Sequence, residues 1–475
     1  MTNISSSRLH ISDSGWRAVT AEGFTVARLS AVVSALAGLL PPRRAIVGFD
    51  NRFLSKEFGH HVAALLETLG WSVDLIPEMF PTPGVATLAR DTPYDFGLVV
   101  TASHNPYYYN GLKVLDASGA LIGRDLADRI EKRANEILEG RIHPEGGFSR
   151  DSPLHFDLHR RFAGLADVEA LRRRYIDSIL KHVDAAKIRA AGLSVAWDAF
   201  AGTVTPLFPL FLDSLGVRQT GVPMAMEPTF GRRRLEPDAT SLTELGALVP
   251  RSGAIAGLAT DVDGDRFSAM DHAGLYVQNN PLGTLMAWYL LAIRGERGTV
   301  SQTVSCSELT RRVCADFGVP LRIEPVGFMS MGRHMVEDPN PLIGFEETGG
   351  MAYGPHLPFK DGLMAHGLVL EMLATTGRTI PELIADLGRR YGHFHYHRVD
   401  LKLPSREEAE KWLDPLLWER AVGEAVLETS TLDGVKWSFR SGWILIRRSK
   451  TEPLLRIYGE STDETFIDRM KKAAS

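Results

Sequence analysis

The residues of this chain with the clearest chemical potential begin at residue 101, where the sequence reads Thr-Ala-Ser-His-Asn-Pro. This segment follows the apolar run 96–100, which is typical of a buried strand, and the proline favours a change from strand to loop. Ser103 supplies a hydroxyl, His104 an imidazole and Lys113, a little further on, an amine. A serine hydroxyl is a weak nucleophile, so it would need a base or a metal ion to activate it. By itself the segment is equally compatible with a plain turn, because serine, asparagine and proline are common turn residues.

A second segment carries Asp261, Asp263 and Asp265 directly after the apolar run 254–259. In an extended chain alternate side chains point to the same side, so these three carboxylates are expected to converge. Without a cation they would repel one another and raise each other's pKa. A divalent cation removes this conflict, and ligands that are all oxygen favour Mg²⁺. The segment therefore predicts a magnesium site.

Three other interpretations compete for the acidic segment. A calcium-binding EF-hand is rejected, because its sixth and twelfth positions should be glycine and glutamate but here are Arg266 and His272. A phosphatase of the haloacid-dehalogenase type, with Asp261 as the phosphoryl acceptor, stays open. A plain acidic turn is the least favoured, because an apolar strand leads into the segment.

Composition narrows the class of protein. The chain has 475 residues, of which 44% are apolar and 23% charged, so it is expected to form several globular domains. A net charge of −5 gives no general attraction to nucleic acid or to an acidic membrane surface. The two cysteines, Cys306 and Cys314, suggest buried thiols in a reducing compartment. The first residues are polar and no stretch is long and apolar enough to span a membrane, so we expect a cytoplasmic protein.

Apolar patterning predicts alternating strands and helices along most of the chain. Strands are expected at 45–49, 96–100, 193–197, 254–259 and 342–345, with helices such as 26–40, 57–69, 168–182 and 282–293 between them, and 141–162 as a linker. Three successive units each carry a strand that runs into a polar loop, which suggests related α/β domains. The last unit shows strand-like alternation and a hairpin near 436–446. The predicted domains are 1–160, 161–275, 276–392 and 393–475.

Four segments together carry a family resemblance: 101–106, 261–266, 346–350 and 447–458. They resemble, in order and over nearly the whole chain, the motifs of the α-D-phosphohexomutases, the family of phosphoglucomutases and phosphomannomutases. The resemblance implies an α/β fold of four domains around a central cleft. Three of these would be related α/β domains with mixed sheets, and the fourth a smaller C-terminal α+β domain.

The resemblance also implies a role for individual residues. Ser103 would carry a phosphoryl group and, with Asp261, Asp263 and Asp265, bind one Mg²⁺ per chain. Lys113 would be the general acid/base, Arg17 would face the reacting phosphate, and His104 would position the loop or act as a base. The residues expected to hold the substrate are Arg266, Glu346, Thr348, Arg447, Ser449, Lys450, Thr451 and Arg456.

The implied activity moves phosphate between C1 and C6 of a hexose through a hexose 1,6-bisphosphate, which would also activate the enzyme. Phosphoglucomutase is favoured and phosphomannomutase comes next, with glucose 1,6-bisphosphate synthase as a close variant. Aspartyl-phosphate phosphatase, or sugar-phosphate binding without turnover, are the alternatives from other classes. The expected partners are small sugar phosphates, with neither nucleic acid nor membrane, in a monomer or homodimer.

Some positions depart from the family pattern. Arg448 and Lys450 stand where relatives commonly have proline and glycine, which could tighten phosphate binding or shift substrate preference. Met329 stands where many relatives carry lysine, so one substrate contact is expected to be absent or supplied by Arg333.

Overall fold

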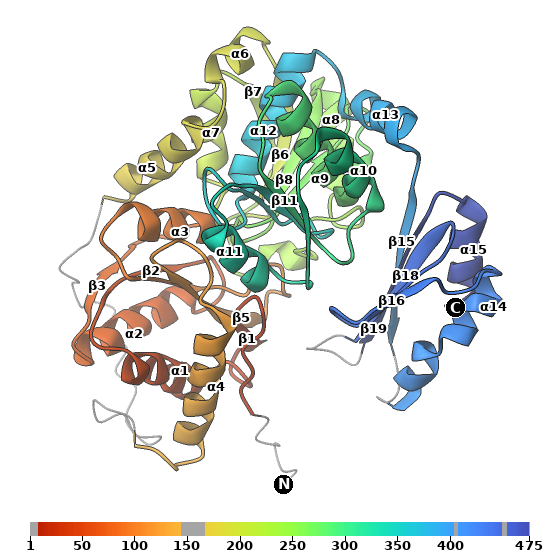
Figure 1. The fold of residues 1–475 in the computed structure, drawn as a ribbon. Helices are drawn as coiled ribbons and strands as arrows, with labels where there is room; N and C mark the ends of the chain where they lie inside the picture. Colours follow the sequence, from red (N-terminus) through yellow and green to blue (C-terminus); the bar gives the residue numbers. More distant parts are fainter. Residues whose placement is uncertain (1–7, 144–166, 403–406, 449–453, 475) are drawn as a thin grey trace. The chain divides into compact units, whose positions relative to one another are not determined.

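The computed structural model describes residues 8–143, 167–402, 407–448 and 454–474 (Figure 1). The chain divides into two compact units. The first unit comprises Met1–Gln278, Gly327–Gly344 and Thr348–Thr379, and the second comprises Asn279–Val326, Phe345–Glu347 and Ile380–Ser475. Each is described by itself. Among the helices that the structure describes, none combines the length and apolar character needed to cross a membrane.

The first unit begins with a mixed five-stranded sheet in the order β1-β5-β4-β2-β3. Its strands are β1 (Trp16–Val19), β2 (Arg44–Phe49), β3 (Ser72–Leu75), β4 (Phe96–Val100) and β5 (Tyr109–Asp116). Its helices are α1 (Val26–Leu39), α2 (Ser55–Thr68), α3 (Thr82–Asp91) and α4 (Arg124–Leu138). In Figure 1, α3 lies on one face of this sheet and α1 and α2 lie on the other. The sheet is therefore covered on both faces, which explains why β4 is apolar at every position.

A second five-stranded sheet follows in the order β10-β9-β8-β6-β7. Its strands are β6 (Ser194–Asp198), β7 (Arg218–Gly221), β8 (Ala256–Thr260), β9 (Phe267–Met270) and β10 (Tyr276–Val277). The helical segments here are α5 (Val168–Leu180), α6 (Ala185–Ala190), α7 (Leu207–Ser214), η1 (Phe230–Arg232) and α8 (Thr243–Ser252). The unit also contains α11 (Phe328–Glu337), β13 (Pro341–Phe345, whose last residue belongs to the second unit), β14 (Met351–Tyr353) and α12 (Gly362–Thr376).

The two sheets share one topology. In each, two neighbouring pairs are parallel, β4-β2 and β2-β3 in the first and β8-β6 and β6-β7 in the second. In each sheet, the strand at the end of this parallel group pairs antiparallel with the strand that follows it in the chain: β4 pairs with β5, and β8 pairs with β9. The loop at this last connection holds Ser103 in the first sheet and the three aspartates in the second. The corresponding connection between β13 and β14 holds residues 346–350. The repeated theme seen in the sequence therefore reflects a repeated topology.

The second unit contains a parallel strand pair and a separate antiparallel sheet. The pair is β11 (Thr299–Thr303) and β12 (Leu321–Glu324), with helices α9 (Asn279–Trp288), η2 (Tyr289–Ile293), α10 (Glu308–Phe317) and α13 (Ile380–Tyr391). The sheet has the order β15-β19-β18-β17-β16, and its strands are β15 (His395–Lys402), β16 (Glu428–Ser430), β17 (Val435–Ser438), β18 (Gly442–Arg448) and β19 (Leu454–Ser461). The same part of the chain contains three helices, η3 (Glu407–Leu413), α14 (Pro415–Val422) and α15 (Glu464–Ala473).

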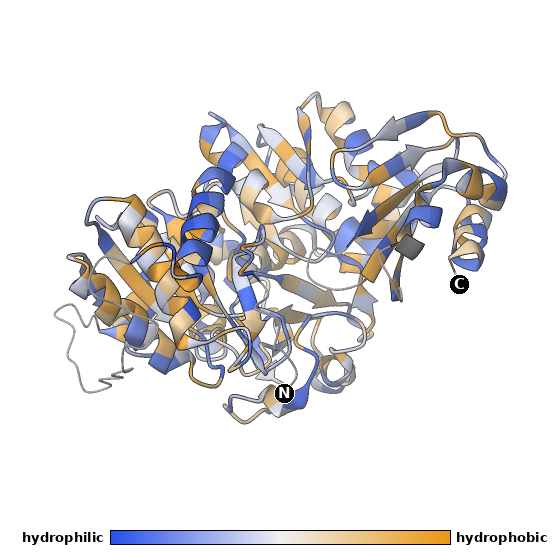
Figure 2. Cartoon of the chain, turned by 90° about the horizontal axis from the view of Figure 1, so that it is seen from below, coloured by the Kyte–Doolittle hydropathy of each residue, from blue (hydrophilic) through white to orange (hydrophobic). Residues whose placement is uncertain are grey.

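Many helices carry both hydrophobic and hydrophilic residues, as expected for elements that bury one face (Figure 2). The antiparallel sheet of the second unit buries one such face against α14 and α15, with Trp418, Trp437 and Phe466 in its core. The predicted helix at 282–293 is α9 followed by a π-helical turn, η2. Most of the predicted linker at 141–162 lies outside the described residues.

Candidate active site

The Ser103 loop lies at the carboxyl end of β4, between two antiparallel strands. Ser103 is only 1% exposed and has a φ of 52°, a left-handed conformation that is uncommon for a residue other than glycine. Its Oγ donates a hydrogen bond of 2.6 Å to Oδ2 of Asp261, which is 158 positions away in the chain. The structure thus brings together the hydroxyl and the acidic segment that the sequence singled out separately.

The acidic segment is a turn, which corrects the predicted extended conformation. Strand β8 ends at Thr260, and the N–H of Gly264, at a φ of 77°, donates to the carbonyl of Asp261. Alternation along a strand is therefore not what makes the carboxylates converge. They converge because the turn wraps around Asp261, whose Oδ1 accepts the N–H groups of Asp265 and Arg266 at 3.1 Å each.

The three carboxylates form a buried cage. Asp261, Asp263 and Asp265 are each 0% exposed, and one oxygen from each lies within 4.8 Å of the others. Burial and the two neighbouring carboxylates raise the pKa of Asp261 to about 7. Oδ1 of Asp263 and Oδ1 of Asp265 are buried without a hydrogen bond from the described residues, and the second has only the ammonium of Lys360 nearby, at 3.4 Å. Buried carboxylate oxygens that lack donors are the ligands a hard divalent cation takes, so this donor set fits Mg²⁺.

Lys113 sits against this cage. Its Nζ lies 2.6 Å from Oδ2 of Asp263 and 2.6 Å from Oδ2 of Asp265, and its side chain is 2% exposed. Burial alone would lower the pKa of Lys113, but the two carboxylates outweigh it and raise that pKa. Burial likewise pushes the pKa of Asp263 upward, but the ammonium outweighs it and lowers that pKa. Lys113 is therefore held as an ammonium beside the acidic segment, in which Asp261 accepts the hydrogen bond from the Ser103 hydroxyl.

Arg17 approaches from the edge strand β1, where it pairs with Gly111 on β5. Its Nη1 donates to Oδ1 of Asn105 at 2.8 Å, so it holds the Ser103 loop directly. Its Nε is buried, and no described residue offers it an acceptor. Burial lowers the pKa of Arg17, while the charges of Asp263 and Asp265 act in the opposite direction. A buried donor of this kind beside a candidate phosphorylated serine is suited to an anion.

His104 lies between the serine and Arg266. Its Nδ1 is 3.4 Å from Ser103 Oγ, and its Nε2 is 3.3 Å from Nη2 of Arg266. A guanidinium group only donates hydrogen bonds, so Nε2 accepts and the neutral ring carries its proton on Nδ1. Burial, and next the charge of Arg266, lower the pKa of His104 well below its ordinary value. This geometry suits positioning of the serine oxygen better than general base chemistry.

Two residues at the cage were not predicted from the sequence. Thr82, the first residue of α3, donates from Oγ1 to Oδ2 of Asp263 at 2.6 Å and from its N–H to the carbonyl of Asp263 at 2.9 Å. Lys360, just before α12, lies 3.4 Å from Oδ1 of Asp265. Neither residue stands in a local pattern that suggests chemistry, and each is far along the chain from the aspartate it contacts.

The predicted sugar-binding residues fall in both units. Thr348 belongs to the first unit, in a segment joined to β9 by a hydrogen bond of 2.8 Å from the Phe267 N–H to the Gly349 carbonyl. Glu346 belongs to the second unit and is 6% exposed. Its neighbour Glu347 accepts a hydrogen bond of 2.7 Å from Ser305 and is therefore held within the second unit.

The predicted phosphate-binding residues belong to the second unit. Arg447 on β18 and Arg456 on β19 are cross-strand partners. Arg447 is paired with Asp433 at 2.7 Å, whereas Nε of Arg456 is buried without an acceptor among the residues that the structure describes. Like charges placed opposite each other in a sheet are unfavourable, so this pair suits an anion. Ser449, Lys450 and Thr451 lie outside the described residues.

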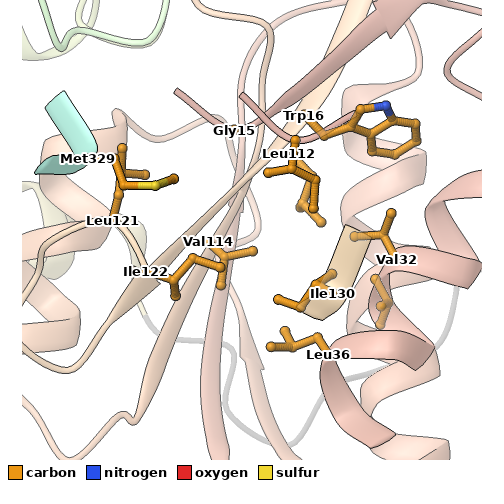
Figure 3. A pocket seen from close by; sticks show the side chains of 12 residues that line it. Gly15, Trp16, Val32, Leu36, Leu112, Val114, Leu121, Ile122, Ile130 and Met329 are labelled. Carbon is orange, nitrogen blue, oxygen red and sulfur yellow. The ribbon is translucent and has the colours of Figure 1, made fainter. Parts of the chain in front are cut away.

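The departures from the family pattern can also be located. Met329 is 4% exposed and, with residues such as Trp16 and Val32, lines an apolar cavity of about 20 Å³ (Figure 3). Arg333 donates to Oδ2 of Asp116 at 2.5 Å. Arg448 is exposed and pairs with Glu410. Met329 thus fills space in the core of the first unit, and Arg333 is held by a carboxylate.

Family models match the chain over four consecutive regions. Residues 8–141, 173–274 and 278–391 match the α/β/α domains I, II and III of phosphoglucomutase/phosphomannomutase, and residues 405–474 match its C-terminal domain. The chain belongs to the α-D-phosphohexomutase family. The predicted family, the four-domain α/β fold class and the enzyme class, an isomerase that transfers phosphate within a hexose phosphate, are confirmed. The residue boundaries predicted for the domains stay a prediction.

Individual relatives agree with this assignment. A phosphoglucosamine/phosphogalactosamine mutase of Sulfurisphaera tokodaii is 31% identical over 401 residues, covering 82% of each chain. A phosphoglucomutase/phosphomannomutase of Thermococcus kodakarensis is 29% identical, covering 88% of this chain and 86% of the relative. The crystal structure of a putative phosphomannomutase from Thermus thermophilus matches with a TM-score of 0.83 at 25% identity, covering 98% of each chain. The names of these phosphohexomutases span several hexose phosphates.

Proposed function

We propose that this phosphohexomutase interconverts hexose 1-phosphate and hexose 6-phosphate through phosphorylated Ser103 and a hexose 1,6-bisphosphate intermediate. The same bisphosphate would activate the enzyme by phosphorylating Ser103. The observation that carries the proposal is the hydrogen bond of 2.6 Å from Ser103 Oγ to Asp261 within a buried cage of three carboxylates. A phosphorylated serine there would lie against a cation held by the cage.

Phosphoryl transfer needs little covalent work from the protein, because positioning and charge neutralisation provide most of the catalysis. Mg²⁺ held by Asp261, Asp263, Asp265 and the phosphorylated Ser103 would supply charge neutralisation. Arg17 places its guanidinium on the same loop and would bind the transferring phosphoryl group. Lys113 would be the general acid/base for the sugar hydroxyl: it would donate a proton as the ammonium held by Asp263 and Asp265, and accept one once those carboxylates bind Mg²⁺.

The remaining predicted residues would hold the sugar and its second phosphate. Glu346 and Thr348 can bond neighbouring hydroxyls of the ring. Arg447 and Arg456 offer two guanidinium groups to a phosphate, and Ser449, Lys450 and Thr451 would complete that site. Because each of the two phosphates must in turn lie against Ser103, the bisphosphate has to reorient between the two transfers.

We take glucose as the favoured hexose and glucosamine as the second candidate. The loop 345–350, which reads Phe-Glu-Glu-Thr-Gly-Gly, resembles glucose-type members, whereas the relative from Sulfurisphaera tokodaii is named for glucosamine and galactosamine phosphates. Mannose is the third. Partners other than small sugar phosphates are not proposed, and the predicted monomer or homodimer stays a prediction.

The test compares kcat/KM for glucose 1-phosphate, glucosamine 1-phosphate and mannose 1-phosphate with Mg²⁺ and the matching bisphosphate. The proposal expects turnover of all or some of these, highest for glucose 1-phosphate, and none by Ser103→Ala. A higher value for glucosamine 1-phosphate would assign the second candidate. Net formation of glucose 1,6-bisphosphate from a different phosphoryl donor would assign the synthase variant instead.

The aspartyl-phosphatase alternative has a structural objection. Both oxygens of Asp261 are engaged, Oδ2 by the Ser103 hydroxyl and Oδ1 by two backbone N–H groups. An aspartate bonded in this way is poorly placed to attack phosphorus. An acyl phosphate would be cleaved by hydroxylamine and a phosphoserine would not, so hydroxylamine treatment of the phosphorylated protein separates the two mechanisms.

A further inference from the structure

Arg52 is a buried arginine that contacts the Ser103 loop from behind. It lies between β2 and α2, and its side chain is 0% exposed. Its guanidinium donates to the backbone carbonyls of three loop residues, Ser103 at 2.5 Å, Asn105 at 2.6 Å and Pro106 at 2.7 Å, and to that of Tyr109, the first residue of β5, at 3.2 Å. Its Nε donates to Oδ2 of Asp50 at 3.1 Å.

These contacts use the whole hydrogen-bonding capacity of the group. A guanidinium carries five N–H donors and no acceptor, and here it makes five hydrogen bonds. None is left for a substrate, so Arg52 does not act by binding phosphate. Its fork geometry instead gathers four carbonyl groups, from the loop and the start of β5, around one cation, which a lysine ammonium with three donors cannot do.

Asp50, the ion-pair partner of Arg52, is linked to the backbone N–H of Ser103 through Thr101. Oδ2 of Asp50 accepts a hydrogen bond of 2.6 Å from Oγ1 of Thr101. Thr101 Oγ1 in turn accepts a hydrogen bond of 2.9 Å from the N–H of Ser103. The N–H and the C=O of Ser103 are therefore both tied, through Thr101 and Arg52, to one buried ion pair. This double attachment holds Ser103 at a φ of 52°, a left-handed conformation that is unfavourable for a residue other than glycine.

We infer that Arg52, paired with Asp50, is a positioning residue that fixes Ser103 in the left-handed conformation from which its Oγ meets the acidic cage. This inference rests on the proposed function. It assigns to Arg52 an effect on the rate of phosphoryl transfer and not on the binding of the sugar phosphate. A displacement of about 1 Å at a reacting group can lower a rate by about 100-fold, which sets the expected scale.

The experiment uses Arg52→Lys, which keeps the charge, and Thr101→Val, which keeps the shape but removes the hydroxyl bridge. Each variant is phosphorylated with glucose 1,6-bisphosphate, and its phosphoserine content is measured by intact mass. The rate of phosphoryl transfer to glucose 1-phosphate is then measured in a single turnover and divided by that content. Arg172→Lys is the matched control, because Arg172 is a buried guanidinium of the same unit that pairs with Glu78 at 2.8 Å, away from the loop.

We expect Arg52→Lys to lower the transfer rate per phosphoserine by about 100-fold and Thr101→Val by about tenfold, with KM changed less than about threefold. Thr101→Ser, which restores the hydroxyl, should return the rate to near that of the parent. Arg172→Lys should lower the melting temperature without changing the rate per phosphoserine. A purely structural role for Arg52 would give the same pattern as Arg172.

Two results would overturn the inference. One is a transfer rate per phosphoserine that stays within about threefold of the parent in both Arg52→Lys and Thr101→Val. If Arg52→Lys does not fold, the comparison of Thr101→Val with Thr101→Ser decides alone. The other is a parent protein that never acquires phosphoserine, which would overturn the proposed function together with this inference.

Discussion

The buried contact of Lys113 with two aspartates makes a quantitative prediction about stability and metal binding. Lys113→Met keeps most of the side-chain volume but removes the ammonium that lies 2.6 Å from each of Asp263 and Asp265. Removing one partner of a buried ion pair leaves an uncompensated charge and costs about 3–5 kcal/mol. We therefore expect the variant, with EDTA present, to melt lower than the parent by on the order of 10 °C.

The same substitution should strengthen the response to Mg²⁺. In the parent the ammonium competes with a divalent cation for the same carboxylate oxygens, so its removal should raise Mg²⁺ affinity by about tenfold or more, or about 1.4 kcal/mol. Stabilisation by a ligand that binds only the folded state grows with its concentration relative to Kd, so Mg²⁺ should recover much of the lost melting temperature. The assay is thermal melting in EDTA and across a Mg²⁺ titration.

The matched control is Lys436→Met. Lys436 is a lysine of the second unit whose side chain is 12% exposed and whose Nζ donates to the Val304 carbonyl at 3.0 Å, not to the acidic cage. Its removal should leave the shift produced by Mg²⁺ equal to that of the parent. If Lys113→Met melts at the temperature of the parent in EDTA and gains no more from Mg²⁺ than Lys436→Met does, the ammonium neither stabilises the cage nor competes with Mg²⁺ for it.

Two further predictions concern a phosphate-binding residue of the second unit and the loss of folding stability at acid pH. Arg456→Gln should raise KM for the hexose phosphate by about tenfold or more without lowering the melting temperature, because Arg447 loses a like-charged cross-strand neighbour; an unchanged KM in steady-state kinetics would contradict this. His366 is 0% exposed, bonded to the Ala259 carbonyl at 3.0 Å, and burial lowers its pKa from 6.5 to about 4. As pH falls from about 6.5 the unfolded chain binds this proton before the folded one, so stability should fall by about 2 kcal/mol by about pH 5. In urea unfolding the parent should lose about 2 kcal/mol more than His366→Gln does over this pH range, and equal losses would count against it.

The sequence could predict the elements whose patterns are local. The apolar run 96–100 is β4 as expected, and the strand before the acidic segment is β8. The segments with Ser103 and with the three aspartates could be singled out because each concentrates reactive side chains after a strand. The prediction that the acidic segment is extended was wrong, because hydrogen bonds to Asp261 turn the backbone there, and no residue pattern reports those bonds.

Contacts between distant segments could not be predicted from local patterns. Thr82 bonds Asp263 across 181 positions, and Arg52 bonds the Ser103 carbonyl across 51. Such residues look like an ordinary helix start and an ordinary strand end until the topology places them beside the site. Met329 is a different case: the sequence suggested that a substrate contact common in relatives is absent there or supplied by Arg333, and the Met329 side chain lines an apolar cavity.

The central claim is that a phosphoryl group resides on Ser103 beside the carboxylates of Asp261, Asp263 and Asp265. Its most direct test is to incubate the protein with glucose 1,6-bisphosphate and Mg²⁺, digest it, and map the phosphorylated peptide by mass spectrometry with and without hydroxylamine. The account predicts one phosphoryl group on Ser103, stable to hydroxylamine and transferred to added glucose 1-phosphate. Phosphate on any other residue, above all a hydroxylamine-labile group on Asp261, would contradict it.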